Sequence, residues 1–483
     1  MLFTESAQRR ALARLLRGIA PTPWGRSLRL DPRMPLSDLV DVPPTGPGDV
    51  EPFVARIVDG ERDAMWTEGA VGLVRTTGTT GGARLLPLTA AHRRDLLAFA
   101  RRLVLSQVRR GAAPLPRLSR WLLVTASTEI ARVGGLPAGY AAALVQDAVR
   151  MVRPASAVPD PDIAAVDSRE ARLDRLVAVS RGARVGVLFG APADLVALLG
   201  RLSELVGRPV ADVWPTLEEI AWIGAHLGPH RAALERLVGR PVAFREVYGG
   251  AEGGFGADLK GDGRLRLVAG RIVFVFEPVG GGRRRLLHEL AEAAPGSRFE
   301  VLVTTSAGLV QYRLGDVIEV RPGQPPAVAI VGRTGEVLSA AGEGLVPAEA
   351  QGALGELAAT LGLDVVDWLA SPAPVPDAEG RPRLRFVVEG RSPLPEADLA
   401  ERLDAALARR SGGYAHARGA GRLGAVEVRL LPAGALEPYR SAVWPSGGPV
   451  KARPFAASWG ALLERPGAGA VLAQLDEATP GRW

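Results

Sequence analysis

Short apolar runs alternate with amphipathic segments along most of this 483-residue chain. Apolar runs of a few residues between turn-forming residues are typical of buried strands, whereas apolar residues spaced three or four apart are typical of helices. Strands that alternate with helices indicate an α/β fold. In the first two thirds of the chain, the predicted strands are 121–125, 185–189, 272–276, 301–304 and 328–331, and the predicted helices include 89–110 and 193–206.

Beyond Gly332 the alternation starts again on a smaller scale, which predicts a compact β-α-β unit. We therefore expect two parts: an α/β domain of residues 1–335, with mixed β-sheets and flanking helices, and a small α+β domain of residues 336–483. The predicted elements of the second part are strands at 365–369, 384–388 and 426–431 and a helix at 396–409.

Composition excludes several kinds of protein. The chain has no cysteine, which rules out disulfides, thiolate zinc sites and a cysteine nucleophile. No apolar run approaches the length of a membrane span, and the N-terminus lacks the pattern of a signal peptide, so we expect a cytoplasmic protein that binds no membrane. The histidines His226 and His230 are four apart, but Gly228 and Pro229 between them break the helix that a two-histidine metal motif requires.

The net charge of +7 raises the question of a nucleic-acid partner. Only two of the 59 basic Lys and Arg residues are lysines, and the arginines are scattered rather than clustered. We therefore expect no nucleic-acid partner. Because Arg stays protonated and forks while Lys is a compact charge whose pKa is easily shifted, the two remaining lysines, Lys260 and Lys451, are candidates for specific roles.

A glycine- and threonine-rich segment between a strand-like run and the helix at 89–110 is the first candidate site. Glycines let backbone N–H groups converge on one anion, hydroxyls add donors and a cation neutralises charge, so such a segment is suited to phosphate. The segment is not a Walker loop, because no Gly-Lys-Ser/Thr follows its glycines. An ordinary hairpin loop remains the alternative interpretation. Its residues are Thr76, Thr77, Gly78, Thr79, Thr80, Gly81 and Gly82, followed by Arg84.

Two further loops carry groups that can bind a nucleotide. In EVYGGAEGGFG, Tyr248 and Gly249 precede Glu252, so that an aromatic face and a carboxylate are presented from one glycine-rich loop. In VTTSAGLVQYRLGDVIEV, Tyr312 and Asp316 stand immediately before a strand. Each segment alone is weak evidence, and their order along the chain is what discriminates.

That order, followed by the pair Gly332–Arg333, resembles the motif order of adenylate-forming enzymes, which include acyl-CoA synthetases, peptide-synthetase adenylation domains and luciferases. Within this superfamily, the wording of TTGTTGGARLLPLT, VYGGAEGG, VLVTTSAGLVQYRLGDVIEV and GGPVKARP is similar to that of the auxin-responsive acyl-acid amido synthetases. The resemblance spans nearly the whole chain. It implies a large adenylate-forming N-terminal domain and a small, mobile C-terminal domain.

The resemblance also implies an activity. Such an enzyme uses ATP and Mg²⁺ to convert a carboxylic acid into an acyl-adenylate and pyrophosphate, and then transfers the acyl group to an amine or amino acid to form an amide. Two alternatives stay open: transfer to the thiol of CoA or of a carrier protein, and a non-catalytic protein that binds nucleotides or nucleic acid. A monomer is the favoured oligomeric state.

The family's motif positions fall on particular residues of this chain. The resemblance assigns catalytic roles to Lys451 near the α-phosphate, to Glu252, which would also hold Mg²⁺, and to Arg84 beside the phosphates. It assigns the other nucleotide contacts as follows: phosphates to Thr76, Thr77, Gly78, Thr79, Thr80 and Gly81, adenine to Tyr248 and Gly249, the pocket wall to Tyr312, ribose to Asp316, and ribose or phosphate to Arg333.

The sequence departs from the family's pattern at two places. Arg84 stands where the family usually has a lysine in the phosphate loop, and the loop is one residue shorter. Gly344 stands where the family has a lysine after Gly-Glu. We expect the acid pocket to be lined from 126–213 and around 249–255, mostly by apolar residues, which favours an aromatic or medium-chain acid; Arg132 or Arg245 would meet a polar substituent.

Overall fold

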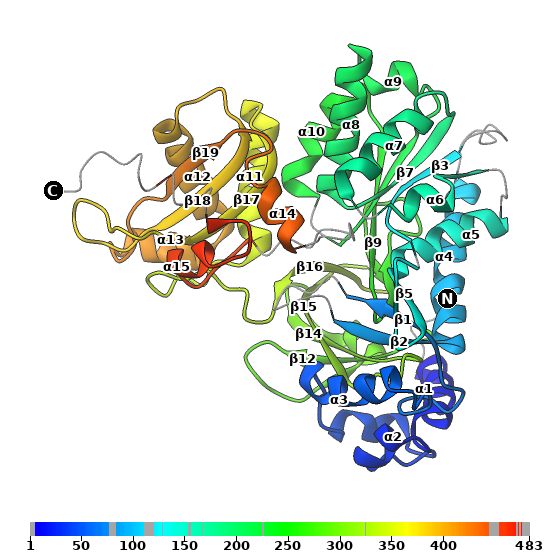
Figure 1. Ribbon diagram of the computed structural model, residues 1–483. Helices are drawn as coiled ribbons and strands as arrows, with labels where there is room; N and C mark the ends of the chain where they lie inside the picture. The colour runs from blue at the N-terminus through cyan, green and yellow to red at the C-terminus, as the bar shows by residue number, and fades with distance from the viewer. Residues whose placement is uncertain are drawn as a thin grey trace.

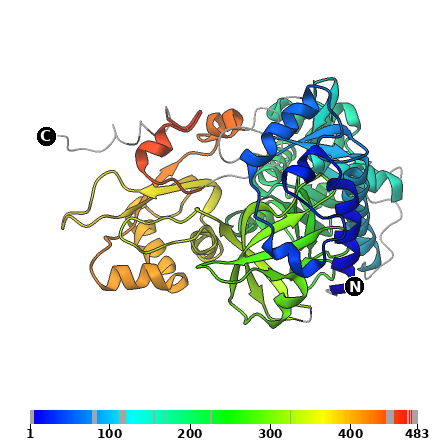
Figure 2. The ribbon, with the colours of Figure 1, turned by 90° about the horizontal axis from the view of Figure 1, so that it is seen from below.

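The computed structural model describes residues 5–76, 84–110, 120–127, 129–152, 156–166, 168–224, 227–323, 325–443 and 454–469, together with Leu472 and Leu475. The described strands form four sheets, three in the first two thirds of the chain and one in the last third. In Figure 1 the C-terminal part, yellow to red, stands beside the helices α8 (Pro192–Val206) and α10 (Gly228–Val238) of the larger part. Figure 2 shows the same separation from below.

The largest sheet has parallel strands at its centre and one antiparallel end. Strands β6, β3, β7, β8 and β9 run parallel, whereas β9, β10 and β11 pair antiparallel. Its order is β11 (Arg266–Leu267), β10 (Gly253–Ala257), β9 (Ala243–Gly250), β8 (Glu219–Ile223), β7 (Val185–Gly190), β3 (Arg120–Val124) and β6 (Ala157–Val158).

Helices cover both faces of this sheet, which explains why its strands read as unbroken apolar runs. Leu122 and Leu188 pack on one face with α7, α8 and α10, and Leu123 and Val187 pack on the other face with α4 and α5. The helices of this region not yet given are α4 (Ala90–Arg110), α5 (Leu144–Val152), α6 (Pro161–Ala164), α7 (Arg169–Ser180) and α9 (Val210–Val213), with a 3₁₀ turn, η2 (Ala141–Ala143).

A five-stranded antiparallel sheet and a smaller sheet complete the N-terminal body. The first helix fastens to the larger of them, because the Gln8 side chain donates to the Ile272 carbonyl and accepts from the Phe274 N–H. The sheets are β13 (Arg285–Leu286), β12 (Val273–Pro278), β14 (Arg298–Thr304), β15 (Tyr312–Arg321) and β16 (Ala327–Arg333), and β2 (Leu85–Thr89), β1 (Ala70–Arg75), β5 (Leu136–Gly139) and β4 (Ala131–Val133).

Short helices pack around these two sheets. The Trp24 indole N–H donates to the Gly308 carbonyl at 2.9 Å, which ties the N-terminal helices to the loop after β14. These helices are α1 (Glu5–Ile19), α2 (Pro23–Ser27), α3 (Pro47–Val58) and the 3₁₀ helices η1 (Leu36–Asp41) and η4 (Leu287–Glu292).

The C-terminal part has its own core, which begins at Leu338. Strand β18 pairs antiparallel with β17 and parallel with β19, so the β-α-β unit expected from the sequence is present. The largest core of the N-terminal body extends to Val328, and the boundary after Gly335 stays a prediction. The elements are α11 (Pro347–Leu361), β17 (Asp364–Pro372), β18 (Leu384–Arg391), α12 (Glu396–Arg410), α13 (Gly412–Gly419), β19 (Glu427–Leu431), α14 (Glu437–Val443) and α15 (Trp459–Leu463).

The predicted α/β architecture is confirmed, since each predicted strand and helix has a counterpart in the structure within a few residues. His92 stands directly before Arg93 and Arg94 in the sequence, yet it is buried at 1% exposure. Among the described residues, no helix is long and apolar enough to cross a membrane.

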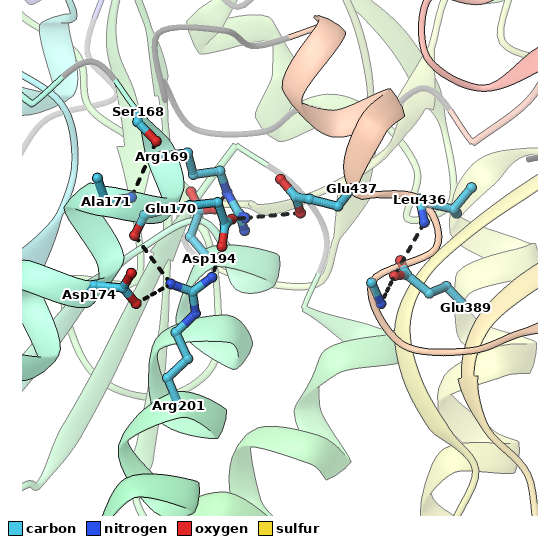
Figure 3. A network of polar contacts seen from close by, with 11 residues as sticks. Ser168, Arg169, Glu170, Ala171, Asp174, Asp194, Arg201, Glu389, Leu436 and Glu437 are labelled. Carbon is cyan, nitrogen blue, oxygen red and sulfur yellow. Dashed lines mark hydrogen bonds and ion pairs between the residues drawn. The ribbon is translucent and has the colours of Figure 1, made fainter. Parts of the chain in front are cut away.

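Ion pairs and close backbone contacts join the two parts. Arg236 of α10 lies 3.2 Å from Asp364 of β17. Figure 3 shows a second link, in which Arg169 of α7 contacts Glu437 of α14 at 3.2 Å while its Nε pairs with Asp194 of α8 at 2.7 Å. These contacts hold the C-terminal part against the helices that cover one face of the largest sheet.

Candidate active site

Three of the predicted nucleotide contacts are linked by one hydrogen bond and one ion pair. The Tyr248 hydroxyl donates to Asp316 Oδ2 at 3.0 Å, and Arg333 Nε lies 3.3 Å from Asp316 Oδ1. Tyr248 lies near the end of β9 of the largest sheet, whereas Asp316 and Arg333 belong to β15 and β16 of the five-stranded sheet. These three side chains therefore mark the place where two sheets meet.

Strand register explains why Asp316 and Arg333 meet. They are directly opposite each other in the antiparallel pair β15–β16, so that their side chains share one face. Gly315 leaves room for the cation: a Cβ on it would lie 3.2 Å from Arg333 Nη2, and its φ of +76° favours glycine. Arg333 Nη2 also donates to the Leu314 carbonyl at 2.5 Å.

Tyr248 is buried at the meeting point. Its exposed fraction is 4%, and its ring centroid lies 5.0 Å from that of Phe255. Burial raises the pKa of the Tyr248 phenol well above its usual value, and the neighbouring Asp316 carboxylate raises it further. The phenol therefore stays protonated and acts as a hydrogen-bond donor to Asp316.

Charges from three segments act on the second predicted tyrosine, Tyr312. Burial raises the pKa of its phenol above the usual range and Glu252 raises it further, whereas Arg84 and Arg333 lower it. These three charged side chains therefore lie within electrostatic reach of one hydroxyl. Glu252 and Arg333 also act on the Tyr248 phenol, so these two charges influence both tyrosines.

The ends of the glycine- and threonine-rich loop are tied to each other at the tip of the β1–β2 hairpin. The Thr76 N–H donates to the Arg84 carbonyl at 2.8 Å, and the Arg84 N–H donates to Thr76 Oγ1 at 3.2 Å. The Arg84 guanidinium lies 3.4 Å from Glu51 of α3. Five predicted phosphate contacts and the predicted cation lie outside the described residues: Thr77, Gly78, Thr79, Thr80, Gly81 and Lys451.

His92 supports the turn that carries Glu252. Its Nε2 donates to the Ala251 carbonyl at 2.9 Å, and its backbone N–H donates to Thr89 Oγ1 at 2.9 Å. Burial lowers the pKa of the imidazole, so the neutral ring is favoured. The spacing already contains this signal, because His92 lies four residues before Leu96 and therefore on the apolar face of the helix.

A small apolar cavity adjoins Gly249. Its volume is about 60 Å³, and its walls come from α4, the segment 140–145 and the β9–β10 turn. The segment 140–145 and the β9–β10 turn fall within the ranges from which we expect the acid pocket to be lined. Helix α4 lies outside those ranges. The arginines predicted to face the acid do not line this cavity: Arg132 is exposed and paired with Glu129, and Arg245 is buried.

Arg245 has a structural role that the sequence did not reveal. It is 2% exposed, pairs with Glu219 at 2.6 Å and donates to the Leu103 carbonyl at 3.2 Å and to Ser106 Oγ at 3.0 Å. A charge on a strand that is covered on both faces requires such a partner. Its position between two strands and α4 therefore serves the fold.

The residues at the site could bind Mg²⁺ only together with the phosphates of a nucleotide. No group of three or more His, Asp or Glu side chains suited to a metal occurs within the described ranges. Mg²⁺ commonly binds through one or two carboxylates together with substrate phosphates, and Glu252 remains the predicted carboxylate. Gly344 has a φ of +63°, a conformation that side chains rarely adopt, which agrees with the loss of a lysine there.

The structure is similar to those of adenylate-forming enzymes over nearly its full length. It matches the GH3.15 acyl acid amido synthetase solved in complex with 2,4-DB, with a TM-score of 0.74, 17% identity, and coverage of 97% of this chain and 93% of that chain. It also matches 2-hydroxyisobutyryl-CoA ligase in the postadenylation state with 2-HIB-AMP, with a TM-score of 0.64, 14% identity, and coverage of 98% and 92%. At these identities the likeness establishes the fold.

Sequence models identify the family. The model of the GH3 family N-terminal domain matches residues 3–204, and that of the GH3 family central domain matches residues 271–333. Together they cover more than half of the chain, which belongs to the GH3 family. This confirms the resemblance drawn from the motifs. A comparison with curated protein sequences found no match.

The likeness also depends on the state of the ligase that is compared. Against the same ligase with 2-HIB-AMP and CoA in the thioesterification state, the TM-score falls to 0.52. Coverage is the same for both ligase states, so the difference reflects how the parts of the ligase are arranged.

Proposed function

We propose that this protein is an ATP-dependent acyl-acid amido synthetase, which adenylates a carboxylic acid and transfers the acyl group to an amine or amino acid. The observation that carries the proposal is the convergence of Tyr248, Asp316 and Arg333 in a chain of the GH3 family. Arg84, at the end of the phosphate-type loop, lies within electrostatic reach of Tyr312. Beside this convergence lies an apolar cavity suited to the acid.

The proposed nucleotide site uses each group for what its chemistry allows. Asp316 accepts hydrogen bonds from the ribose hydroxyls, since a carboxylate has capacity beyond its bonds to Tyr248 and Arg333. Tyr248 and Gly249 border the adenine, and Tyr312 forms part of the pocket wall. Arg333 holds the ribose or a phosphate from the end of β16.

In this proposal, the loop between β1 and β2 binds the phosphates. Thr76, with the loop residues that follow it, supplies hydroxyl and backbone donors, and Arg84 and Lys451 supply positive charge. Mg²⁺, held by Glu252 and the phosphates, would neutralise part of the negative charge. Arg84 forks where a lysine would act as a point charge, so it spreads its donors over more than one oxygen.

The chemistry asks the protein mainly to bring two anions together. The acid's carboxylate attacks the α-phosphorus of ATP and pyrophosphate leaves; the amine nitrogen then attacks the acyl carbon, AMP leaves and the nitrogen loses a proton. Positioning and charge stabilisation account for most of the acceleration of such steps. No covalent bond to the protein is required.

We assign the small C-terminal part to alternate between the two half-reactions by rotation near Gly335. Its core is separate from those of the N-terminal body, and Gly335 has a φ of +79° in the connection between β16 and α11. Hinges of this kind absorb a backbone change in a few residues at the end of an element. Lys451 would approach the α-phosphate in one orientation only.

Acid-dependent pyrophosphate release tests the first half of the proposal. Purified protein with ATP and Mg²⁺ is screened against a broad set of carboxylic acids, with Asp316→Asn as the variant of the site. We expect release with particular acids only, and much weaker release from the variant. Nucleotide binding without release for any acid would instead support a non-catalytic protein.

The acceptor is tested on the best acid. Products are analysed by mass spectrometry after incubation with amino acids, with simple amines, or with CoA. An amide is expected, and a CoA thioester without any amide would overturn the proposed second step in favour of thiol transfer, which the likeness to a CoA ligase makes the main competitor.

A further inference from the structure

A larger cavity lies directly behind the proposed acid pocket. Its volume is about 410 Å³, against about 60 Å³ for the acid pocket. Its walls come from α4, from the segment 268–272 and from the loop after β14. The residues that line both cavities are Leu96 and Phe99 of α4 and Gly253 and Gly254 of β10.

The partition between the cavities is thin, because β10 has no side chains where it passes between them. A Cβ on Gly254 would lie 2.2 Å from Phe99 Cδ1, so the phenyl ring rests directly on the strand backbone. A Cβ on Gly253 would lie 2.8 Å from Ile272 Cδ1. Phe99 is only half-buried, whereas Leu96 is 6% exposed. The Phe99 ring is therefore the side chain best able to move.

The acid pocket is small in this arrangement. An apolar cavity of about 150 Å³ holds one benzene molecule, and the pocket has less than half of that volume. A short aliphatic acid fits such a space. If Phe99 yields, the distal part of an aromatic or medium-chain acid can enter the cavity behind it.

We propose that Phe99 determines substrate length: it separates the acid pocket from a side chamber that receives the distal part of longer or aryl-substituted acids. This inference rests on the proposed function and deepens it. Phe99 acts by shaping the pocket and takes no part in the chemical steps.

The chamber is electrostatically suited to a substrate that carries a negative charge at its other end. Asp95 lines it, but the carboxylate pairs with Arg14 at 2.9 Å and with Arg271 at 2.6 Å. It also accepts a hydrogen bond from Ser306 Oγ at 2.7 Å. Its charge is thus compensated, and it does not repel an organic acid.

The test compares Phe99→Ala and Phe99→Leu with wild type. Pyrophosphate release is measured with straight-chain acids of increasing length and with phenyl-substituted acids, and kcat/KM is compared across the series. Leu105→Ala is the matched control, since Leu105 lies on the same helix, is 36% exposed and lines neither cavity.

We expect Phe99→Ala to raise the kcat/KM ratio of long to short acids by about tenfold or more, because each accommodated methylene favours binding by at least that order. Phe99→Leu should move the ratio in the same direction by less, and Leu105→Ala should leave it unchanged. An unchanged kcat/KM ratio of long to short acids in Phe99→Leu would overturn the inference. The same result in Phe99→Ala would overturn it if that variant keeps the melting temperature of wild type.

A binding measurement separates failure of this inference from failure of the proposed function. The shift in melting temperature caused by each acid is recorded without ATP for the same variants. If wild type releases no pyrophosphate with any acid, the proposed function fails. The inference that Phe99 separates the two cavities is then supported only if long acids raise the melting temperature of Phe99→Ala more than that of wild type. It is overturned if they do not.

Discussion

Asp316 combines two tasks at the residue scale. It accepts the Tyr248 hydrogen bond that joins two sheets, and it pairs with Arg333 across neighbouring strands. Both tasks need a carboxylate at this position, and the proposed ribose contact needs it as well. Lys451, in contrast, is assigned to the proposed site only by its motif.

Asp316→Asn should raise the KM for ATP by about 10- to 100-fold, because hydrogen bonds to a charged group are worth about 1.5–3 kcal/mol. Initial rates of pyrophosphate release at varied ATP check this. Tyr248→Phe serves as the comparison, since it removes the bond between the sheets and keeps the carboxylate. An equal rise in KM for both variants would show that the effect comes from loss of the contact between the two sheets and not from loss of a contact to the nucleotide.

Lys451→Ala should slow adenylation by about 10²–10³-fold, the usual loss on removing one well-placed donor from a site of developing charge. The chain offers a matched control in Lys260→Ala, its only other lysine, which lies in the turn between β10 and β11. Pyrophosphate exchange is the measurement. Near-native exchange in Lys451→Ala, with a large loss in Arg453→Ala, would move the role to Arg453.

Glu246 makes stability depend on pH. Burial raises the pKa of its carboxyl from 4.5 to about 7, and the charge of Asp258 adds to the shift. Because the folded pKa is the higher one, the folded state binds more protons between these values. The contribution of Glu246 to stability is therefore greatest below about pH 4.5 and is lost as the pH rises through about 7.

Glu246→Gln should remove this dependence and stabilise the protein by about 1–3 kcal/mol at pH 8, with no gain at low pH. Urea unfolding at several pH values measures it. Glu218, which is exposed and lies just before β8, provides the control as Glu218→Gln. A gain in Glu246→Gln that is the same at every pH would refute the assignment.

At the scale of elements, the largest sheet contains a buried ion pair that joins β8, β9 and α4. Arg245 and Glu219 are 2% and 7% exposed, and Arg245 also reaches the carbonyl of Leu103. The pair holds α4 against the sheet, and α4 in turn supplies His92 to the Glu252 turn and Phe99 to the cavity wall. Packing inside the sheet thus positions the site from behind.

Glu219→Ala should destabilise the protein by about 3–5 kcal/mol, because it leaves the Arg245 charge buried without its carboxylate. The double variant Glu219→Leu with Arg245→Met should recover most of this loss, since both charges are then gone. Thermal unfolding of both variants and of the exposed control Glu218→Ala measures the effect. A loss under about 1 kcal/mol in Glu219→Ala would indicate that the pair is well hydrated.

At the scale of the whole molecule, the C-terminal part is held in one orientation by contacts that span the two parts. The Arg169–Glu437 pair joins α7 to α14, as Figure 3 shows, and Arg236–Asp364 joins α10 to β17. Gly355 of α11 permits a close approach as well, since a Cβ there would lie 3.1 Å from the Gly228 carbonyl oxygen. Rotation near Gly335 would have to break these contacts.

Glu437→Gln should therefore loosen the observed orientation while leaving each core intact. Partly exposed pairs contribute about 0–1 kcal/mol, so we expect a modest increase in the radius of gyration by small-angle X-ray scattering and faster proteolysis near 335. Glu401→Gln on the exposed side of α12 is the control. Unchanged scattering and proteolysis in Glu437→Gln, at low salt where the pair is strongest, would contradict this.

Much of the molecule was predictable because the relevant signals are local. Apolar periodicity depends on neighbours within a few residues, so it located the strands 185–189 and 384–388 and the helix 396–409. Motif order along the chain identified the GH3 family. Arg245 shows the limit: its charge suggested a substrate contact, and nothing near it in sequence indicated its partner Glu219, which lies one strand away.

The sequence by itself determined the fold class, the family and the set of groups that can bind a nucleotide, since these depend on local patterns and their order. Tertiary structure decided which groups meet. Tyr248 and Asp316 are 68 residues apart and touch only because two sheets join there. Whether Phe99 faces one cavity or divides two was decided in the same way, by the packing of α4 on a strand of glycines, which no spacing along the chain records.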